Sequence, residues 1–539
     1  NILVAQHKYF YKSMGKKLFL FIFVVVAYLL YARFVLSPHL YNNFSLIDDP
    51  RTIDHAYYIR KCLAGHGCAD FKTHVLKVEA GTSRITHWLI EGILYQGPAV
   101  DAQFQHELRI YGLGLVLVLL LVLSALSAGS NAIATILGAL IFVTNYSFSE
   151  NLIRLGPVEP YLVLSLGIFS LLFLNLQKLP KEWKTFAIFF LTLILIFFLL
   201  LKEVSIAILP IIPILGRLSP KALNRRLLIT ILVLSGIIFV LTKYFLSIGT
   251  GAVSNYVSEY RLDPGFVIQN MPKFLKLLAV SLNPFLQLSF FVVTLVVIYK
   301  KFRQRIINNH FIYWLLVFVL FTTILFPWRY VLDRYLLVSI YAFSIILSIL
   351  ISKVMSEAEK IPIFIGKRKI LLQLGFIFVF MNLYFLGAPA NIAKTINYRN
   401  WYSVFIQFEA DQVKAMAKYK EDIVYINAKD VIDNWETVYG IPLYLKDFYG
   451  GKPEVKRLGE TYPNNGYLFS RTSLEPIINL DILSETQYRI NDSKTYNISQ
   501  IDPVVFSGAF RARPIQVLND PPLLKEGISY YWEIRKLEQ

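Results

Sequence analysis

The chain has 539 residues, of which 55% are hydrophobic and 17% charged, whereas about a quarter of the residues in soluble domains are charged. Its mean hydropathy of +0.51 excludes an ordinary soluble enzyme, because single soluble cores stop growing near roughly 250 to 300 residues. The net charge of +18 does not indicate nucleic-acid binding, because the Lys and Arg residues stand in short runs between apolar segments and form no single basic face.

The first apolar segment, Leu18 to Leu36, predicts a transmembrane helix, since about 20 apolar residues cross the hydrocarbon core. It is too long for a signal peptide and lacks a small-residue cleavage site. Further candidate spans bring the prediction to about 11 transmembrane helices. These spans lie near residues 109–127, 131–146, 159–176, 185–201, 204–215, 227–246, 284–299, 311–327, 335–352 and 370–388.

The basic clusters between these spans predict their orientation. Lys and Arg concentrate in cytoplasmic loops, and alternation from a cytoplasmic N-terminus places four successive basic loops inside. We therefore expect a multi-pass protein of the plasma (inner) membrane with an extracytoplasmic C-terminus. The basic residues of the four loops are Lys178, Lys181, Lys184; Arg217, Lys221, Arg225, Arg226; Lys300, Lys301, Arg303, Arg305; and Lys353, Lys360, Lys367, Arg368, Lys369.

Two long polar regions then fall on the outer side, namely 37–107 and the tail. The first spaces its apolar residues at helical intervals and predicts helices in the membrane interface, and residues 266–283 show the same pattern. The tail mixes short strand-like segments, such as IVYIN and GYLFS, with helix-like ones. We expect a transmembrane domain over 1–388 and a small extracytoplasmic α/β domain over 389–539.

The outer loop opens with the adjacent acids Asp48 and Asp49. Two neighbouring carboxylates repel each other, which raises one pKa and suits a general base or a ligand for a cation. An exposed turn closed by Pro50 is the alternative. A divalent cation also suits paired acids, so a metal requirement stays open.

Charged residues recur at the outer ends of three later spans. The second outer loop carries Glu150, Arg154 and Glu159, for which dipole complementation or lipid-phosphate binding is the alternative to a site. The segment LLLKEVSIAILP brings Lys202 and Glu203 between two apolar runs, either as site residues or as a salt bridge at a turn. Finally, Arg329 and Arg334 flank a late span as phosphate ligands or interfacial anchors.

The cysteines and histidines of the first outer loop give weaker signals. Cys62 and Cys68 allow at most one local disulfide, which we expect on an oxidising side of the membrane. His55, His66, His74, His87 and His106 match no metal-ligand spacing. The sequence also lacks a P-loop, a GxGxxG motif and a GxSxG motif, which gives no support to nucleotide-driven or triad chemistry.

The order and sidedness of these motifs resemble the polytopic GT-C glycosyltransferases, which include protein O-mannosyltransferases and bacterial aminoarabinose transferases. IDDPRTIDHAYYIRKCLAG is similar to the family's first outer loop, with its acidic pair and interfacial helices. LLLKEVSIAILPIIPIL resembles its Lys-Glu segment, DRYLLVSI its late Arg-Tyr motif, and RLGPVEPYLVL stands in the place of its second-loop acid.

The resemblance implies inverting sugar transfer from a polyprenyl-phosphate sugar to a glycan, lipid or protein acceptor, next to membrane lipid. It implies that Asp48, or its neighbour Asp49, takes the proton of the acceptor hydroxyl. Arg334 and Lys202, assisted by Arg154 or Arg329, stabilise the leaving phosphate. The remaining acids, expected to contact substrate, are Glu150, Glu159 and Glu203.

Two other functions are the alternatives. A transporter or flippase for a lipid-linked or envelope substrate also places charges in a helical bundle, but usually near the midplane and in repeats. A non-enzymatic membrane sensor would leave Asp48, Lys202 and Arg334 without a common cavity. Convergence of these side chains in one outward-facing pocket distinguishes the enzyme from the other two.

The predicted topology is testable with reporter fusions. A reporter fused after Leu176 is expected on the cytoplasmic side, and one fused at Gln539 on the outer side, because the basic loops fix the orientation. Opposite readings of a periplasmic and a cytoplasmic reporter at the two positions check this. The same side at both would remove the outer-face site.

Overall fold

The computed structural model describes most of the membrane part and the strands of the tail. The described residues are 18–37, 49–76, 85–94, 102–218, 232–233, 236–237, 261–289, 308–328, 330–358, 367–417, 423–427, 440–445, 449–450, 454–457, 466–473, 488–497, 516–517 and 529–537.

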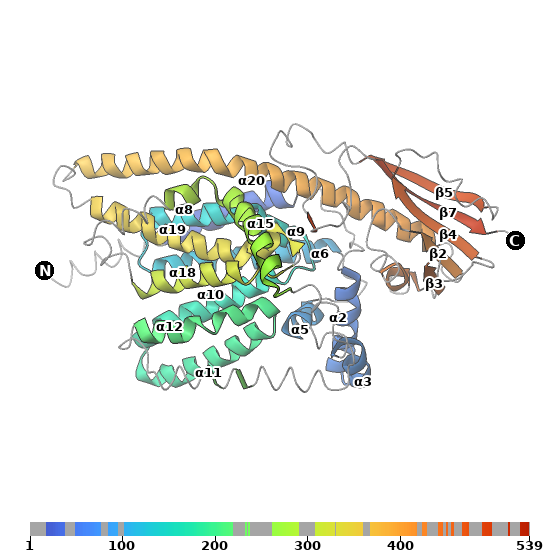
Figure 1. Cartoon of the computed structure of the whole chain (residues 1–539), viewed down its shortest axis with the longest axis horizontal. Coiled ribbons are helices and arrows are strands. Elements are labelled where there is room, and N and C mark those ends of the chain that lie inside the picture. Colours follow the sequence, from blue (N-terminus) through green and yellow to red (C-terminus); the bar gives the residue numbers. More distant parts are fainter. Residues whose placement is uncertain are drawn as a thin grey trace.

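The core of the membrane part is a helical bundle around α19, Leu337–Ala358 (Figure 1). This helix packs against α18, α8, α10 and α7, and 94% of its apolar stretch is buried. A helix that is apolar all round is buried all round. Gly138 lets α8 approach closely, since an added Cβ would stand 2.7 Å from the Ser344 carbonyl oxygen.

The bundle helices follow the predicted order. The helices before α19 are the first helix Leu18–Leu36, α6 Ala102–Glu107, η3 Leu108–Leu113, α7 Gly114–Ser127, α8 Ala132–Val143, α9 Tyr146–Ile153, α10 Glu159–Asn175, η4 Leu176–Lys178, α11 Lys181–Leu199, η5 Glu203–Ile208, α12 Ile211–Leu218, α15 Pro264–Leu282, α18 Asn309–Thr323 and η6 Asp333–Leu336. A short strand, β1 Tyr330–Val331, precedes η6, and α20 Lys367–Met416 follows α19.

Within the described residues, five helices are long and apolar enough to cross a membrane, or six if the pair α8 and α9, bent by 55°, is one span. The protein is thus a multi-pass membrane protein, and the count of about 11 stays a prediction. The predicted span at 204–215 is short: η5 and α12 replace one long helix. Those at 227–246 and 284–299 lie largely outside the described residues.

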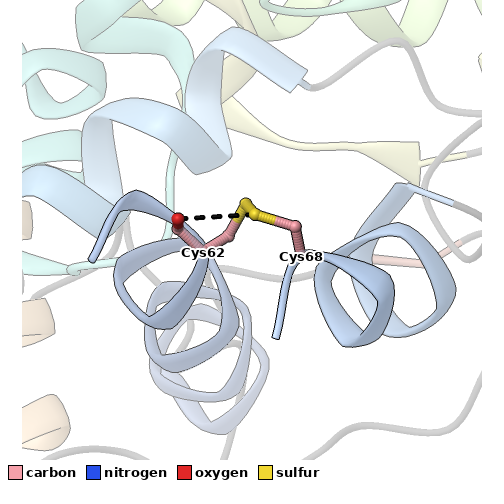
Figure 2. Close-up of a disulfide and its surroundings, with 2 residues drawn as sticks. All are labelled: Cys62 and Cys68. Atoms are coloured by element: carbon pink, nitrogen blue, oxygen red, sulfur yellow. Dashed lines mark hydrogen bonds between the residues drawn. A yellow bond between two sulfur atoms is a disulfide. The ribbon is translucent and has the colours of Figure 1, made fainter. Parts of the chain in front are cut away.

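Three short helices of the first outer loop lie beside the bundle: α2 Asp49–Leu63, α3 Cys68–Phe71 and α5 Ile85–Leu94. α2 packs against both α3 and α5. The expected disulfide joins Cys62 to Cys68, and it connects the end of α2 to the start of α3 (Figure 2). Lys61 and Asp70 form an ion pair of 2.9 Å across the same turn.

α20 links the bundle to the tail. It runs along the bundle and continues toward the sheet, on the side where α2, α3 and α5 lie (Figure 1). The helix passes without a break through residue 388, where the predicted boundary lies. The independent α/β domain stays a prediction.

The tail contributes one five-stranded sheet to the described structure. Its order is β3-β2-β4-β7-β5, with β2 parallel to β3 and β4, and β7 antiparallel to β4 and β5. A separate strand, β6 Gln516–Val517, pairs with β1 in the loop before η6. The five strands are β2 Ile423–Asn427, β3 Glu454–Arg457, β4 Gly466–Ser473, β5 Tyr488–Asn497 and β7 Ser529–Leu537.

The disulfide provides a prediction on local stability. Replacing both cysteines, Cys62→Ser with Cys68→Ser, is expected to cost about 2 kcal/mol of local stability, because the unfolded loop is no longer closed. Hydrogen exchange of residues 62–71 should become faster, while α19 keeps its protection. The matched control, Lys61→Ala, removes the exposed ion pair and should change little. Unchanged exchange in the double variant would show that the bond does not stabilise this turn.

Candidate functional site

The predicted charged residues of the later loops meet at one end of the helical bundle, which the predicted topology places on the outer side. Glu159 is the first residue of α10, and Lys202 directly precedes η5. Arg334 lies on η6, the short turn that leads into α19. Each charge thus stands where a helix begins.

Glu159 and Lys202 form a direct, buried ion pair. The Lys202 ammonium also lies 4.3 Å from the centre of the Tyr335 ring. Its backbone carbonyl accepts a hydrogen bond of 2.6 Å from the Ser205 hydroxyl. Removing either charge would leave its partner unpaired at low dielectric, which is strongly destabilising.

This ion pair forms one wall of a small pocket. The polar lining consists of Glu159, Lys202, Glu203 and the Tyr335 ring, and the rest is apolar. Such a pocket suits an amphipathic ligand with an anionic head and a hydrocarbon chain. The apolar and aromatic lining residues are Leu162, Val204, Phe321, Leu325, Trp328 and Val338.

Arg334 borders this pocket. Its guanidinium lies 5.3 Å from the centre of the Tyr335 ring, and it interacts electrostatically with both Glu159 and Glu150. Arg154, which is buried, interacts with Glu150 as well and forms a hydrogen bond with Tyr398 of α20. The structure therefore places six of the predicted residues in one region, namely Glu150, Arg154, Glu159, Lys202, Glu203 and Arg334.

The η6 turn is held from both sides. The Asn151 side-chain nitrogen donates to the Arg334 carbonyl oxygen at 2.9 Å. The Asp333 carboxylate accepts from Lys394 Nζ at 2.8 Å and from the Ser281 hydroxyl at 3.3 Å. These contacts fix the backbone from which the Arg334 side chain extends.

Lys394 belongs to α20 and is missing from the sequence-based site. Its ammonium also lies 4.1 Å from the centre of the Tyr146 ring. The signal was present in NIAKTINYRNWY, where polar and aromatic residues recur at helical spacing. This segment follows residue 388, the predicted end of the transmembrane domain. The residues on this face of α20 are Asn391, Lys394, Thr395, Tyr398 and Tyr402.

A second buried cluster, also missed from the sequence, supports the loop that carries Arg154. The Arg109 guanidinium donates to the carbonyl oxygens of Asn151, Leu155 and Pro157 and lies 3.6 Å from the Glu91 carboxylate. The Tyr161 hydroxyl donates to Glu91 at 3.0 Å. Burial raises the pKa of Glu91, and Arg109 and Tyr161 oppose this rise.

The structure does not describe the side chains of three predicted site residues. Asp48 and Arg329 lie outside the described residues, and Asp49 is the first residue of α2, its side chain not described. Among the described residues, no group of three or more His, Cys, Asp or Glu side chains is arranged to hold a metal ion. His55, His87 and His106 are buried separately.

No protein-family model and no curated protein matches the sequence. Among solved structures, ArnT from Cupriavidus metallidurans, bound to undecaprenyl phosphate, aligns with a TM-score of 0.50 and 13% identity over 86% of this chain and 95% of that one. The archaeal oligosaccharyltransferase AglB from Archaeoglobus fulgidus, in complex with an inhibitory peptide and a dolichol-phosphate, aligns with a TM-score of 0.46 and 10% identity over 82% of this chain and 65% of its own.

This chain thus spans slightly less than two thirds of the length of AglB. The alignment with ArnT covers most of both chains. The chain therefore shares the overall fold of ArnT, in agreement with the fold that the resemblance to the GT-C glycosyltransferases predicts.

Proposed function

We propose that this protein is an inverting glycosyltransferase, which moves a sugar from a polyprenyl-phosphate donor to an acceptor on the outer face of the membrane. The observation that carries the proposal is the buried Glu159–Lys202 ion pair, which lines a pocket whose other wall is apolar and aromatic. A polyprenyl-phosphate sugar has a chain that stays in hydrocarbon and an anionic head at the surface. The undecaprenyl phosphate bound by ArnT has the same two parts.

The leaving phosphate is the group that needs stabilisation. Transfer turns a phosphodiester with one negative charge into a monoester that approaches two, and fixed cations in a poorly screened site stabilise that gain. Arg334 is half-buried at the edge of the pocket. Its planar fork suits two phosphate oxygens. Lys202 already contacts Glu159, and we assign it the second cationic contact.

The acceptor hydroxyl needs a base as it attacks the anomeric carbon. We assign this base to Asp48, with Asp49 as its neighbour. Asp49 begins α2, the helix that the first outer loop places beside the bundle. A carboxylate there takes the proton while the sugar–phosphate bond breaks, and the electron pair of that bond leaves with the phosphate.

The transporter alternative receives less support. Its substrate path would cross the bundle near the midplane. Instead, Glu159, Lys202 and Arg334 all stand at the beginnings of helices, at one end of the bundle. The sugar and the class of acceptor, whether glycan, lipid or protein, are left open by this proposal.

Substitution of Arg334 tests the phosphate role. Arg334→Lys keeps the charge but loses the fork, so turnover with a polyprenyl-phosphate sugar should fall, and Arg334→Ala should lower it further, by about 10²- to 10³-fold. Transfer of a radiolabelled sugar in lipid nanodiscs measures this, with thermal melting of each variant as a folding control. A fully active Arg334→Lys protein would indicate an interfacial anchor, since Lys reaches the interface equally well.

Substitution within the acidic pair tests the base. Asp48→Asn should reduce turnover by about 10²- to 10⁴-fold and leave binding of the donor nearly unchanged, because the amide keeps the shape of the side chain. Asp49→Asn is the matched comparison. If only Asp49→Asn loses turnover, the base is Asp49 and not Asp48. Normal turnover in both variants would contradict the glycosyltransferase mechanism.

A further inference from the structure

The inner face of α9 carries a group of hydrogen-bond acceptors that the proposed mechanism does not use. Ser147, Glu150 and Asn151 stand at positions i, i+3 and i+4 of this helix, so they share one face, and all three residues are fully buried. Among the described residues, four of their oxygen atoms have no hydrogen-bond partner: Ser147 Oγ, Glu150 Oε1 and Oε2, and Asn151 Oδ1.

The orientation of the Asn151 amide is set by its neighbours. Its nitrogen donates to the carbonyl oxygens of Ser147 at 2.8 Å and Arg334 at 2.9 Å. These carbonyl oxygens can only accept hydrogen bonds, so the amide nitrogen of Asn151, and not its oxygen, must face them. The amide oxygen Oδ1 therefore remains available as an acceptor. The face as a whole therefore calls for a ligand that donates several hydrogen bonds.

Burial without partners costs free energy for each polar atom, and most of all for a carboxylate. Proteins retain such groups chiefly where a ligand, ion or water satisfies them. Charges of both signs interact electrostatically with the Glu150 carboxylate. They are the cations Arg334, Arg154 and Lys394 and the carboxylate Asp333, which is paired with Lys394 at 2.8 Å. None of them forms a hydrogen bond with its oxygens in the described structure.

These cations decide the chemistry of the ligand. Asp333 offsets the charge of Lys394, so Arg154 and Arg334 leave a net positive charge around Glu150, which attracts phosphate and disfavours an ammonium group. Hydroxyl groups are neutral and donate hydrogen bonds. A sugar attached to a phosphate supplies both parts, because its phosphate contacts the cations while its hydroxyls reach the acceptors.

We propose that the inner face of α9 binds the hydroxyl groups of a neutral sugar on the donor, and that this sugar bears no amino group. The inference rests on the proposed function and deepens it. Arg334 interacts electrostatically with both Glu159, which lines the pocket, and Glu150 of α9. A phosphate in the pocket draws the guanidinium toward itself, and Glu150 then accepts from the sugar.

The test compares binding of the lipid carrier with an attached sugar (loaded) and without one (unloaded). Binding to the purified full-length protein in nanodiscs is measured for undecaprenyl phosphate, for undecaprenyl-phosphate glucose or mannose, and for an undecaprenyl-phosphate amino sugar. Glu150→Gln replaces one acceptor oxygen by a donor. It should weaken binding of the neutral loaded carriers by about 10- to 100-fold, as expected for a hydrogen bond to a charged group, and leave undecaprenyl phosphate within about 2-fold.

Two further variants separate sugar contact from folding. Ser147→Ala removes a buried hydroxyl that has no partner in the described part of the chain, so the variant should fold normally and weaken the loaded carriers alone by about 3- to 10-fold. Glu182→Gln makes the same chemical change at an exposed site at the start of α11, and it should change no affinity.

Several results would overturn the inference. An equal loss for loaded and unloaded carriers in Glu150→Gln would assign Glu150 to the phosphate or to folding. Unchanged binding in both Glu150→Gln and Ser147→Ala would show that α9 does not contact the sugar. Tighter wild-type binding of the amino sugar would contradict the neutral-sugar assignment. If the wild-type protein binds no undecaprenyl phosphate, loaded or unloaded, the proposed function itself fails.

Discussion

The structure depends on one constraint, namely that charges beside hydrocarbon must be paired. A buried ion gains little unless a partner of opposite charge and further hydrogen bonds replace its water. Lys202 meets this condition with Glu159 and the Tyr335 ring, and Lys394 meets it with Asp333 and the Tyr146 ring. Both pairs neighbour Arg334, since Glu159 interacts with it electrostatically and Asp333 precedes it in the chain, so they fix a polar site at the end of an apolar bundle.

The same pairs connect parts of the chain that are far apart in sequence. Asp333 precedes Arg334 directly, whereas Lys394 comes from α20, the helix that continues to the tail sheet. The tail also reaches this region through β6, which pairs with β1 just before η6. The phosphate-binding turn of the proposal is therefore bounded by the bundle on one side and by tail-linked elements on the other.

Much of this site could be predicted because its residues interrupt apolar runs. Glu159, Lys202 and Arg334 each stand beside a long apolar segment, where the cost of burial makes a lone charge conspicuous, and the basic loops place all three on one side. The predicted order of the helices also follows from hydropathy alone. β2 and β4 cover the two segments whose composition is strand-like.

The residues that sequence reasoning missed are those whose partners are set only by tertiary packing. Arg109 lies at the start of a span and reads as an anchor, yet it binds three carbonyl oxygens of a loop more than forty residues away. Lys394 follows Pro389, at which the hydropathy falls, although the helix continues through it. No local sequence pattern indicates that a helix continues beyond the end of its apolar segment.

The proposed chemistry places its two halves on different parts of the molecule. The phosphate ligands stand on the bundle, whereas the proposed base belongs to the first outer loop. α5 holds that loop to the bundle through Glu91, which contacts Arg109 and Tyr161, and through the Thr86 amide, which donates to the Leu200 carbonyl at 3.2 Å. Leu200 lies two residues before Lys202. The alignment of base and phosphate therefore depends on α5, because α5 contacts both the phosphate-binding side of the bundle and the α2 helix that begins at Asp49.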